Sequence, residues 1–393
     1  MTDLGILGAL FLGLFSVGWL FQRWRLPELL GFLLLGLLLP RSLLSPDFLQ
    51  HLTHIGELAI WLLFFFVGLE YSPEHLTRLS RNILGPAALD FALNFGGVAL
   101  LALLFASPLE ALLLGSALYP SSTAVVVRLL MSYGRLANPE TELLIGILIV
   151  EDLVGITLLG LLSPWGHGGA NSPNLLHSFL ALGSVLIVFW SLHHWLIPRL
   201  SRWEWRMENE TLTAFLTFGL VLSVGYLGQA IGLSGALLTF LLGVLLPGDS
   251  ALGRAAEKTL PPFRELSVGI FFFTLSYATD SQRLSFTAGM GWLLYAIMLK
   301  GFSTFWAARW WGLSPRAALR AALSFLPRGE FSLLFGSLSS LWKETISLVI
   351  VGSVAVGTPL LAKAASLAER LYPRRVLPKT KLSLAPDLSA MQT

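Results

Sequence analysis

Long apolar segments follow one another along nearly the whole chain, and they leave room for little except membrane-spanning helices. Thirteen such segments occupy most of the first 371 of the 393 residues. A helix needs roughly 20 residues to cross a bilayer. We therefore predict an all-α polytopic membrane protein with about 13 transmembrane helices. The predicted spans are 3–22, 27–46, 55–71, 83–106, 109–131, 139–163, 174–198, 210–229, 232–247, 263–279, 285–311, 315–341 and 344–371.

The charged residues agree with a membrane setting and orient the chain within it. Only 12% of the residues are charged, whereas a soluble domain carries about 25%. Of the 26 Lys and Arg residues, 21 fall on one side of the predicted membrane and three on the other. The positive-inside rule then puts the N-terminus outside, and the C-terminus with the polar tail 373–393 in the cytoplasm. We expect lipid rather than nucleic acid around the chain, in a bacterial inner membrane.

The chain resembles itself at an offset of about 207 residues. Segment 27–40 aligns with 234–247 through Gly36/Gly243 and Pro40/Pro247, and Phe64-Phe65 aligns with Phe272-Phe273. Ser107-Pro108 likewise aligns with Ser314-Pro315. Six spans precede the seventh and six follow it, so the second copy must enter the membrane from the opposite side. Inverted repeats of this kind are typical of secondary transporters. The predicted division is repeat one at 3–163, a linker helix at 174–198 and repeat two at 210–371, together forming a transmembrane domain over 1–372.

Spans five and twelve each carry a proline near the middle, beside polar residues. Pro120 follows Ser107-Pro108 by twelve residues, and Pro327 follows Ser314-Pro315 by the same distance. A proline removes a backbone donor and disrupts the preceding turn. We therefore predict two crossing, interrupted helices whose ends and free carbonyls face an ion near the midplane. The alternative is a packing kink, which is common in membrane helices.

Two adjacent carboxylates, Glu151 and Asp152, lie in the middle of span six, in GILIVEDLVGI. A carboxylate at the bilayer centre costs at least ~2.5 kcal/mol, so it usually marks a functional site. A structural acid would instead have one close partner and no path to solvent. Lys300 also lies mid-span, in span eleven, and we predict an internal ion pair between it and one of the two acids.

Four further polar residues lie inside the predicted spans, and the sequence leaves two readings for each pair. Arg328 and Glu330 flank Gly329 and either pair with each other or shape the field around an ion. Asp90 and Asn94 lie one helical turn apart on the same face of span four. They either make hydrogen bonds between helices or belong to the polar pathway.

Taken together, these motifs resemble the monovalent cation:proton antiporter-2 family, which includes NapA-type Na⁺/H⁺ exchangers and glutathione-gated K⁺ efflux antiporters. The resemblance covers residues 3–371 and rests on RLPELLGFLLLGLLLP, LLFFFVGLEYSP, PSSTAVV, GILIVEDLVGI, FFFTLSYA, Lys300 and PRGEFSLL. It implies a NapA/NhaA-like antiporter fold and a homodimer. It also implies that core helices 83–163 and 285–371 move against scaffold and dimer helices 3–71 and 210–279.

The resemblance also implies roles for individual residues. Asp152 matches the ion-binding aspartate, and Glu151 occupies the position before it, which Lys300 pairs with in the family. Thr123 and Ser122 match the polar break of span five, and Glu330 matches the acid of the second break. Glu151 departs from the Asp, Asn or Gln that the family commonly has there, so the stoichiometry stays open.

We therefore predict a secondary active transporter that exchanges Na⁺ or K⁺ for H⁺ by alternating access and serves pH homeostasis. The proton and the cation compete for Asp152, which is the only metal site expected, and no cofactor is expected beyond the transported ions. A separate regulatory subunit is left open. The alternatives are a Na⁺-coupled organic-anion symporter of related architecture and a cation channel. An enzyme is disfavoured, because the common hydrolase motifs are missing from the sequence.

Overall fold

The structure is a computed structural model, and it describes residues 3–373 apart from 25, 41, 71–80, 167–174, 196–209, 232, 247–250, 278–285 and 340. Within those residues every regular element is a helix. The polar tail and part of the predicted linker 174–198 lie outside the described residues. The helices are α1 (Asp3–Arg23), α2 (Glu28–Leu38), α3 (Pro46–Glu70), α5 (Arg81–Phe91), the π-helix η1 (Ala92–Gly96), α6 (Gly97–Ala102), α7 (Pro108–Leu118), α8 (Thr123–Ser132), α9 (Pro139–Gly166), α10 (Leu175–Trp195), α12 (Glu210–Ala230), α13 (Gly235–Leu245), α14 (Ala251–Thr259), α15 (Pro261–Tyr277), α16 (Phe286–Trp310), α17 (Pro315–Ser324), α18 (Glu330–Leu338) and α19 (Lys343–Leu371).

Helices occupy all of the predicted apolar segments, but some boundaries differ from the prediction. Six described helices are long and apolar enough to cross a membrane, including α1, α3, α9 and α19. The chain is a multi-pass membrane protein. Helix α2 ends at Leu38 because Pro40 disfavours helical geometry in the residue before it. Helix α3 begins at Pro46 rather than residue 55, and the Ser45 hydroxyl accepts a hydrogen bond from the Phe48 amide at 3.3 Å.

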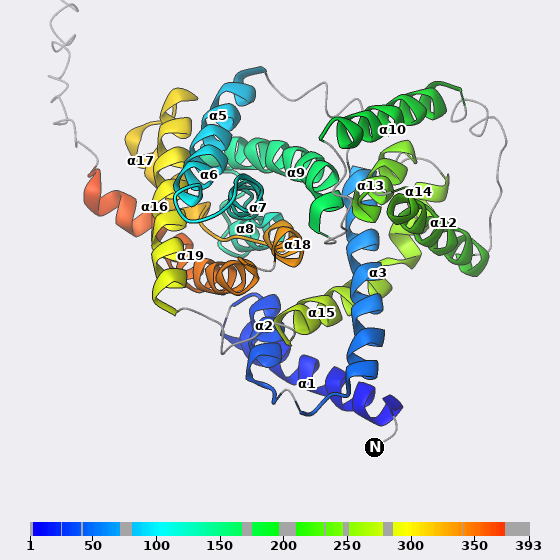
Figure 1. The fold of residues 1–393 in the computed structure, drawn as a ribbon. Helices are drawn as coiled ribbons and strands as arrows, with labels where there is room; N and C mark the ends of the chain where they lie inside the picture. Colours follow the sequence, from blue (N-terminus) through cyan, green and yellow to red (C-terminus); the bar gives the residue numbers. More distant parts are fainter. Residues whose placement is uncertain are drawn as a thin grey trace, which may run out of the picture.

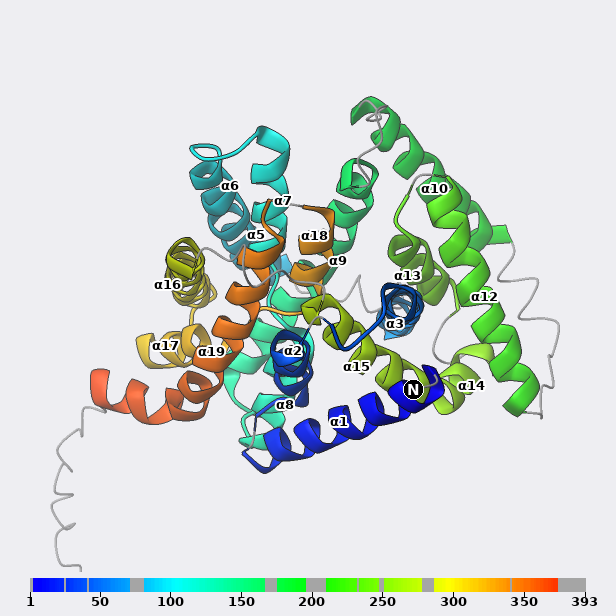
Figure 2. The same ribbon diagram turned by 60° about the horizontal axis from the view of Figure 1, so that its bottom comes forward.

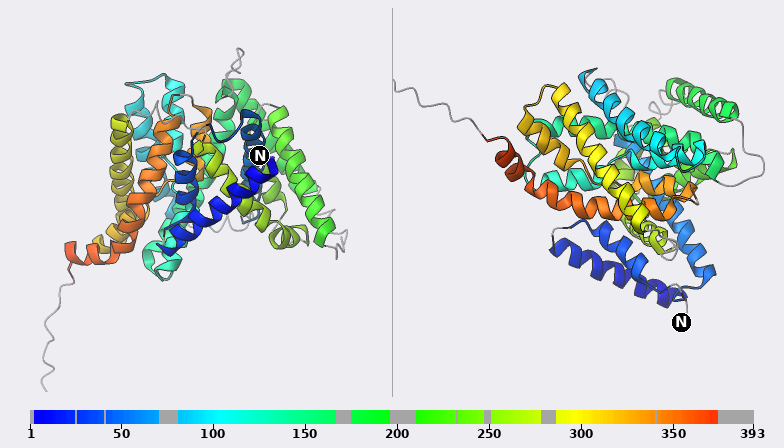
Figure 3. Two further views of the ribbon diagram at one scale, coloured as in Figure 1. Left: turned by 90° about the horizontal axis from the view of Figure 1, so that it is seen from below. Right: turned by 60° about the vertical axis from the view of Figure 1, so that its left-hand side comes forward.

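Apart from α10, which contacts α9 and α13, the helices gather into two groups that lie side by side (Figure 1). One group, here called the break bundle, contains α5, η1, α6–α9 and α16–α19. The other, here called the flanking bundle, contains α1–α3 and α12–α15. Within the flanking bundle α3 packs on α13 and α15, and α2 packs on α1 and α15. Figure 2 shows α1 running obliquely along the outer edge of that bundle, and Figure 3 shows the same division from two further sides.

Two helix crossings in the flanking bundle are close because a glycine stands at each. A Cβ added at Gly36 of α2 would lie 2.4 Å from the backbone oxygen of Phe273 in α15. A Cβ added at Gly243 of α13 would lie 2.1 Å from the backbone oxygen of Phe65 in α3. The two glycines align with each other in the sequence repeat, and so do the two phenylalanines. The same backbone contact is therefore made twice, each time between segments from different halves of the chain.

We expect Gly243→Ala to destabilise the protein by about 1–3 kcal/mol, the usual cost of overpacking a tight contact. The added methyl group meets rigid backbone, so α3 and α13 must separate. Gly219→Ala in α12 is the matched control, because no atom of the described residues lies within 4 Å of an added Cβ there. Thermal unfolding in detergent measures the difference between the two variants. Equal melting temperatures would contradict the close crossing.

The break bundle contains the two interrupted helices. Helix α7 ends at Leu118 and α8 begins at Thr123, while α17 ends at Ser324 and α18 begins at Glu330. Both pairs open in the same way, with a serine cap followed by proline in the first turn. The Ser107 hydroxyl accepts from the amide of Glu110, and the Ser314 hydroxyl accepts from the amide of Ala317, each at 3.3 Å. Pro120 and Pro327 lie within the interruptions.

A buried acid fixes three helices of the break bundle together at one end. Glu140 in the first turn of α9 is fully buried and accepts from Arg135 at 3.1 Å and from Arg320 of α17 at 2.7 Å. Arg135 also donates to the backbone oxygen of Leu361 in α19 at 3.1 Å. The carboxylate thus ties α9 to α17 and, through Arg135, to α19. This link could not be predicted from the sequence, because Glu140 and Arg320 lie 180 positions apart along the chain.

Candidate functional site

The two helix interruptions cross and bond to each other near the centre of the break bundle. The Ser122 amide donates to the Pro327 carbonyl at 2.9 Å, and Ser121 and Arg328 form an isolated antiparallel bridge. At Gly329 an added Cβ would come within 2.5 Å of the Ser122 Cβ, so the crossing requires a glycine. The crossing leaves the ends of four short helices pointing at one small region.

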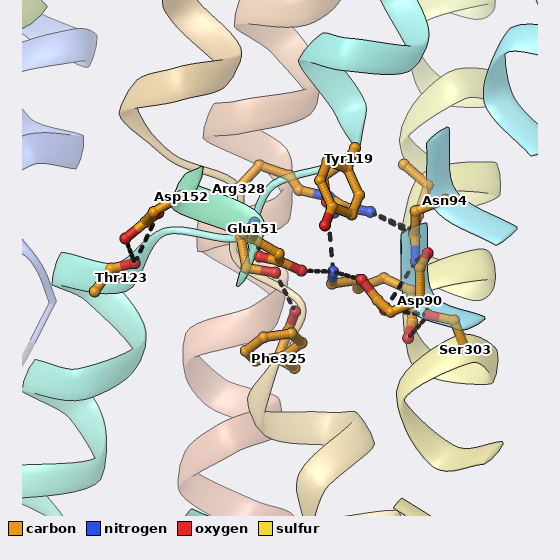
Figure 4. Close-up of polar contacts among 12 residues, drawn as sticks. Asp90, Asn94, Tyr119, Thr123, Glu151, Asp152, Ser303, Phe325 and Arg328 are labelled. Atoms are coloured by element: carbon orange, nitrogen blue, oxygen red, sulfur yellow. Dashed lines mark hydrogen bonds and ion pairs between the residues drawn. The ribbon is translucent and has the colours of Figure 1, made fainter. Parts of the chain in front are cut away.

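Asp152 lies beside this crossing, on α9. The Thr123 hydroxyl donates to its carboxylate, at 3.2 Å from Oδ2 and 3.3 Å from Oδ1 (Figure 4). Thr123 is the first residue of α8, so the carboxylate lies near a helix N-terminus, where partial positive charge favours an anion. Asp152 is only 3% exposed. A buried carboxylate with a hydroxyl group beside it can hold either a proton or a small cation.

A cavity of about 330 Å³ leads to Asp152 between the two bundles. Asp152, Thr123 and Phe331 line it from the break bundle, and α2, α3 and α15 line it from the flanking bundle. Arg128 and Glu265 also line it, and their side chains are 56% and 65% exposed. The cavity therefore connects the protein surface to the carboxylate of Asp152.

An ion pair joins the two bundles beside this cavity. Arg128 of α8 pairs with Glu28 of α2. Arg264 of α15 pairs with its neighbour Glu265, and the Arg264 guanidinium lies 4.6 Å from the ring centre of Phe66. Four charged residues thus line the outer part of a cavity whose remaining lining is largely apolar.

Glu151 points away from this cavity, although it directly precedes Asp152 in the sequence. Figure 4 shows the two carboxylates on different sides of α9. Glu151 is fully buried, accepts from the Ser121 amide at 2.6 Å and pairs with Lys300. The predicted ion pair between Lys300 and one of the two acids is therefore present in the structure, and the acid is Glu151.

Lys300 of α16 has a second carboxylate partner. Its ammonium nitrogen lies 2.8 Å from Oδ2 of Asp90 and 3.4 Å from the backbone oxygen of Tyr119. The ammonium group also lies 4.6 Å from the ring centre of Phe325. The lysine is fully buried. One cation thus bridges acids from α5 and α9, which places Asp90 inside the polar network.

Asn94 and Ser303 hold Asp90 in place. The Ser303 hydroxyl donates to Oδ1 of Asp90 at 2.7 Å, and the Asn94 amide donates to the same oxygen at 3.0 Å. Asn94 lies in the π-helix η1, directly after α5. A π-turn shifts the side chains that follow it, and such turns are frequent at functional sites. The one-turn spacing of Asp90 and Asn94 predicted their shared face, but nothing in the sequence indicated the π-turn.

Arg328 completes the network from the second interruption. Its guanidinium donates to Oδ1 of Asn94 at 3.2 Å and to the backbone oxygens of Tyr119 at 2.7 Å and Ala296 at 3.2 Å. These contacts run across the bundle rather than along its own segment. Glu330 begins α18, but its side chain lies outside what the structure describes.

Ser122 has a structural position beside the site. Its hydroxyl accepts from the Val125 amide at 3.3 Å and so caps α8. It lines a separate cavity of about 20 Å³ with Arg328 and Gly329. Sequence reasoning missed Tyr119 and Ser303, because a carbonyl and a serine among apolar residues carry no signal before the helices are assembled.

The sequence of the chain matches the model of a known protein family. The family model described as "Sodium/hydrogen exchanger, transmembrane" matches residues 8–362. The chain belongs to this family. The expectation of a monovalent cation:proton antiporter family, drawn from the motifs, is confirmed.

Two relatives match this chain over most of their own length. The ammonium/H⁺ antiporter subunit AmhT of Alkalihalophilus pseudofirmus is 30% identical, over 95% of this chain and 96% of the relative. The K⁺/H⁺ antiporter subunit KhtU of Bacillus subtilis is 28% identical, over 80% of each. The two relatives are thus named for different cations.

The fold also matches solved structures. A structure of the sodium proton antiporter MjNhaP1 from Methanocaldococcus jannaschii aligns with a TM-score of 0.66 at 16% identity, covering 95% of this chain and 99% of that one. A second structure of the same protein, at pH 8, gives a TM-score of 0.63 at 17% identity. At this identity the likeness establishes the fold alone: this chain has the helical membrane fold of that protein.

Proposed function

We propose that this chain exchanges a monovalent cation for a proton, and that both ions use the carboxylate of Asp152 in turn. The observation that carries the proposal is the position of that carboxylate. It is buried, it accepts a hydrogen bond from Thr123, and it ends a cavity that reaches the surface. A protonated carboxyl has no charge for a cation to pair with, and a carboxylate that holds a cation has little affinity for a proton. Binding of either ion thus excludes the other.

The cation is Na⁺, K⁺ or ammonium. The sequence predicted Na⁺ or K⁺, and the name of the relative that is 30% identical adds ammonium. The site offers oxygen donors from Asp152 and Thr123, which suit alkali cations and also accept hydrogen bonds from an ammonium ion. We therefore treat these three ions as the candidate substrates.

The break bundle is the moving core and the flanking bundle the scaffold in this proposal. The cavity runs between them, so movement of one bundle against the other changes access to Asp152. The cavity is lined by Arg128 and Arg264, which belong to the side rich in Lys and Arg. By the positive-inside rule that side is cytoplasmic, so this conformation faces inward.

The matched glycine crossings and matched serine caps support an inverted repeat with thirteen spans, in which each half supplies one interrupted helix. Such halves give two arrangements of similar energy, one open to each side. A homodimer in the bacterial inner membrane completes the proposal. Because both relatives are named as subunits, we also propose a separate partner subunit for this chain.

The test is proton movement in proteoliposomes that hold a trapped pH dye and a pH gradient. Na⁺, K⁺ and NH₄⁺ are added one at a time, each as the chloride. We expect at least one of them to drive protons across the membrane faster than in protein-free vesicles, which control for passive entry of ammonia. No response to any of the three would overturn the proposal, and single-channel currents would indicate a channel instead.

Thr123→Val should raise the apparent KM for the cation about tenfold, the equivalent of one lost hydrogen-bonding oxygen near a charged group. Valine keeps the shape of threonine but has no hydroxyl for Asp152 or the ion. Thr157→Val is the matched control on α9, because its hydroxyl is exposed and donates along its own helix, to the Leu153 carbonyl. An unchanged KM in Thr123→Val would remove Thr123 from the site.

A further inference from the structure

Four ionisable side chains meet beneath the crossing of the interrupted helices, and their formal charges cancel. Asp90 and Glu151 contribute two negative charges, and Lys300 and Arg328 contribute two positive charges. Each side chain is at most 1% exposed. We call these four residues the buried charge cluster. Asp152 is not part of this cluster, because it lies on the side of α9 opposite Glu151 and lines the 330 Å³ cavity.

Asp90 is the residue that balances the cluster. Lys300 could pair with Glu151 alone, and Arg328 would then be left with an excess positive charge in a buried place. Instead, Lys300 lies between two carboxylates, Glu151 and Asp90, the second at 2.8 Å. Asn94 links Arg328 to Asp90, because it accepts from the guanidinium at 3.2 Å and donates to the carboxylate at 3.0 Å.

We propose that Asp90 is a positioning residue that keeps Lys300 charged throughout the transport cycle, so that one proton is exchanged for one cation without net charge movement. The inference rests on the proposed role of Asp152. If Lys300 released its proton, the cluster would carry a net negative charge inside the protein, away from water. Burying an uncompensated charge is strongly unfavourable. The proton on Lys300 therefore stays in place.

Glu151 does not take up a second proton in this scheme. It accepts hydrogen bonds from the Ser121 amide and pairs with Lys300, so both of its oxygens have donors. The 330 Å³ cavity is lined by Asp152 and Thr123, and none of the four cluster residues is part of its lining. The other groups that face Lys300 are the ring and backbone oxygen of Tyr119, the ring of Phe325 and the backbone of its own helix near Ser303.

The exchange step then involves the Asp152 carboxyl alone. Its O–H bond breaks as the cation binds, the proton leaves through the cavity, and the carboxylate holds the cation with no change in charge at the site. The reverse occurs on the other side of the membrane. Each cycle moves one positive charge in each direction, so the net charge transferred is zero.

The experiment measures charge and protons together. Proteoliposomes on a solid-supported membrane report charge displacement after a jump in NaCl, KCl or NH₄Cl, and a trapped dye reports proton movement under the same conditions. We expect any of these cations that moves protons to do so without sustained charge transfer. Proton movement accompanied by charge transfer in the wild-type protein would overturn the inference while leaving the proposed function intact. If none of the three cations moved protons, both the inference and the proposed function would be overturned.

Two variants test whether Asp90 itself keeps Lys300 charged. Asp90→Asn leaves the cluster with one excess positive charge, so release of the Lys300 proton becomes favourable and charge transfer should appear with proton movement. The double variant Asp90→Asn/Lys300→Met restores a neutral cluster that has no lysine proton to release, and it should again move protons without charge. Asp47→Asn is the control, because it makes the same chemical change on an exposed face in the first turn of α3, outside the cluster, and should leave proton movement without net charge transfer.

The same inference predicts the size of the cation gradient that balances a given proton gradient, that is, the gradient at which net exchange stops. With the membrane potential held at zero, a tenfold proton gradient should balance about a tenfold cation gradient in the wild-type protein, and a steeper one if two protons move per cation. A wild-type balance near a hundredfold cation gradient would overturn the inference. If Asp90 only stabilised the fold, Asp90→Asn would lower the amount of folded protein. It would not change the cation gradient that balances a tenfold proton gradient.

Discussion

Asp152→Asn abolishes cation-driven proton movement, leaving only the passive leak of the vesicles. Asparagine has nearly the shape of aspartate and can still accept a hydrogen bond from Thr123, so the helix crossing should remain in place. It carries no charge to pair with a cation and no exchangeable acid proton. Loss of a charge-assisted contact of about 3 kcal/mol corresponds to roughly a hundredfold loss of cation binding, and loss of the proton carrier removes the remaining activity.

The matched control for this variant is Asp47→Asn. Asp47 lies on an exposed face in the first turn of α3, so the same chemical change there should leave exchange at the wild-type rate. Dye-reported proton movement in proteoliposomes measures both variants, and detergent melting curves establish that both are folded. Exchange by Asp152→Asn at the rate of Asp47→Asn would remove Asp152 from the mechanism.

Lys300→Met should lower the free energy of unfolding by about 3–5 kcal/mol, the usual cost of breaking a buried ion pair on one side. Methionine fills much of the same space but leaves the carboxylates of Asp90 and Glu151 without their shared cation. Two buried acids of like charge then face each other across the gap. The expected readout is a large fall in melting temperature and a smaller yield of folded protein.

Charge balance, rather than packing, should explain most of this loss. Adding Asp90→Asn to Lys300→Met removes one of the two unpaired acids, so part of the lost stability should return. Lys363→Met on the exposed face of α19 is the control, and it should change stability by less than about 0.5 kcal/mol. If Lys300→Met melts like Lys363→Met, the cluster does not hold the core together as described.

The helices were largely predictable because apolar length is a strong local signal. The interruptions near Pro120 and Pro327 were also predictable from a local signal, because a proline lacks a backbone donor and disturbs the helix within one turn. The early start of α3 depended on the Ser45 hydroxyl, which apolar length cannot detect. Helix α14 escaped prediction because it is polar on one face and too short to span a bilayer. The π-turn after Asp90 has no local sequence signal.

The candidate site was predictable only as far as single residues reveal it. Because Glu151 and Asp152 are adjacent in a helix, their side chains were expected to point in different directions, so the two acids need not share one role. A mid-span lysine implied an acid partner, and Glu151 is one. The second partner, Asp90, lies 210 positions from Lys300 along the chain, so its contact exists only once α5 packs against α16. The sequence left open whether Asp90 and Asn94 make hydrogen bonds between helices or belong to the polar pathway, and only the packing of α5 against α16 distinguishes the two.

The most direct test of the account is the apparent KM for the transported cation, measured in proteoliposomes across a range of pH at zero membrane potential. If a proton and a cation exclude each other at Asp152, the KM should rise by about tenfold for each unit that the pH falls below the range where the carboxyl titrates. The maximal rate at saturating cation should change far less. A KM that stays constant while the maximal rate falls with pH would show that the two ions occupy different sites, and it would contradict the account.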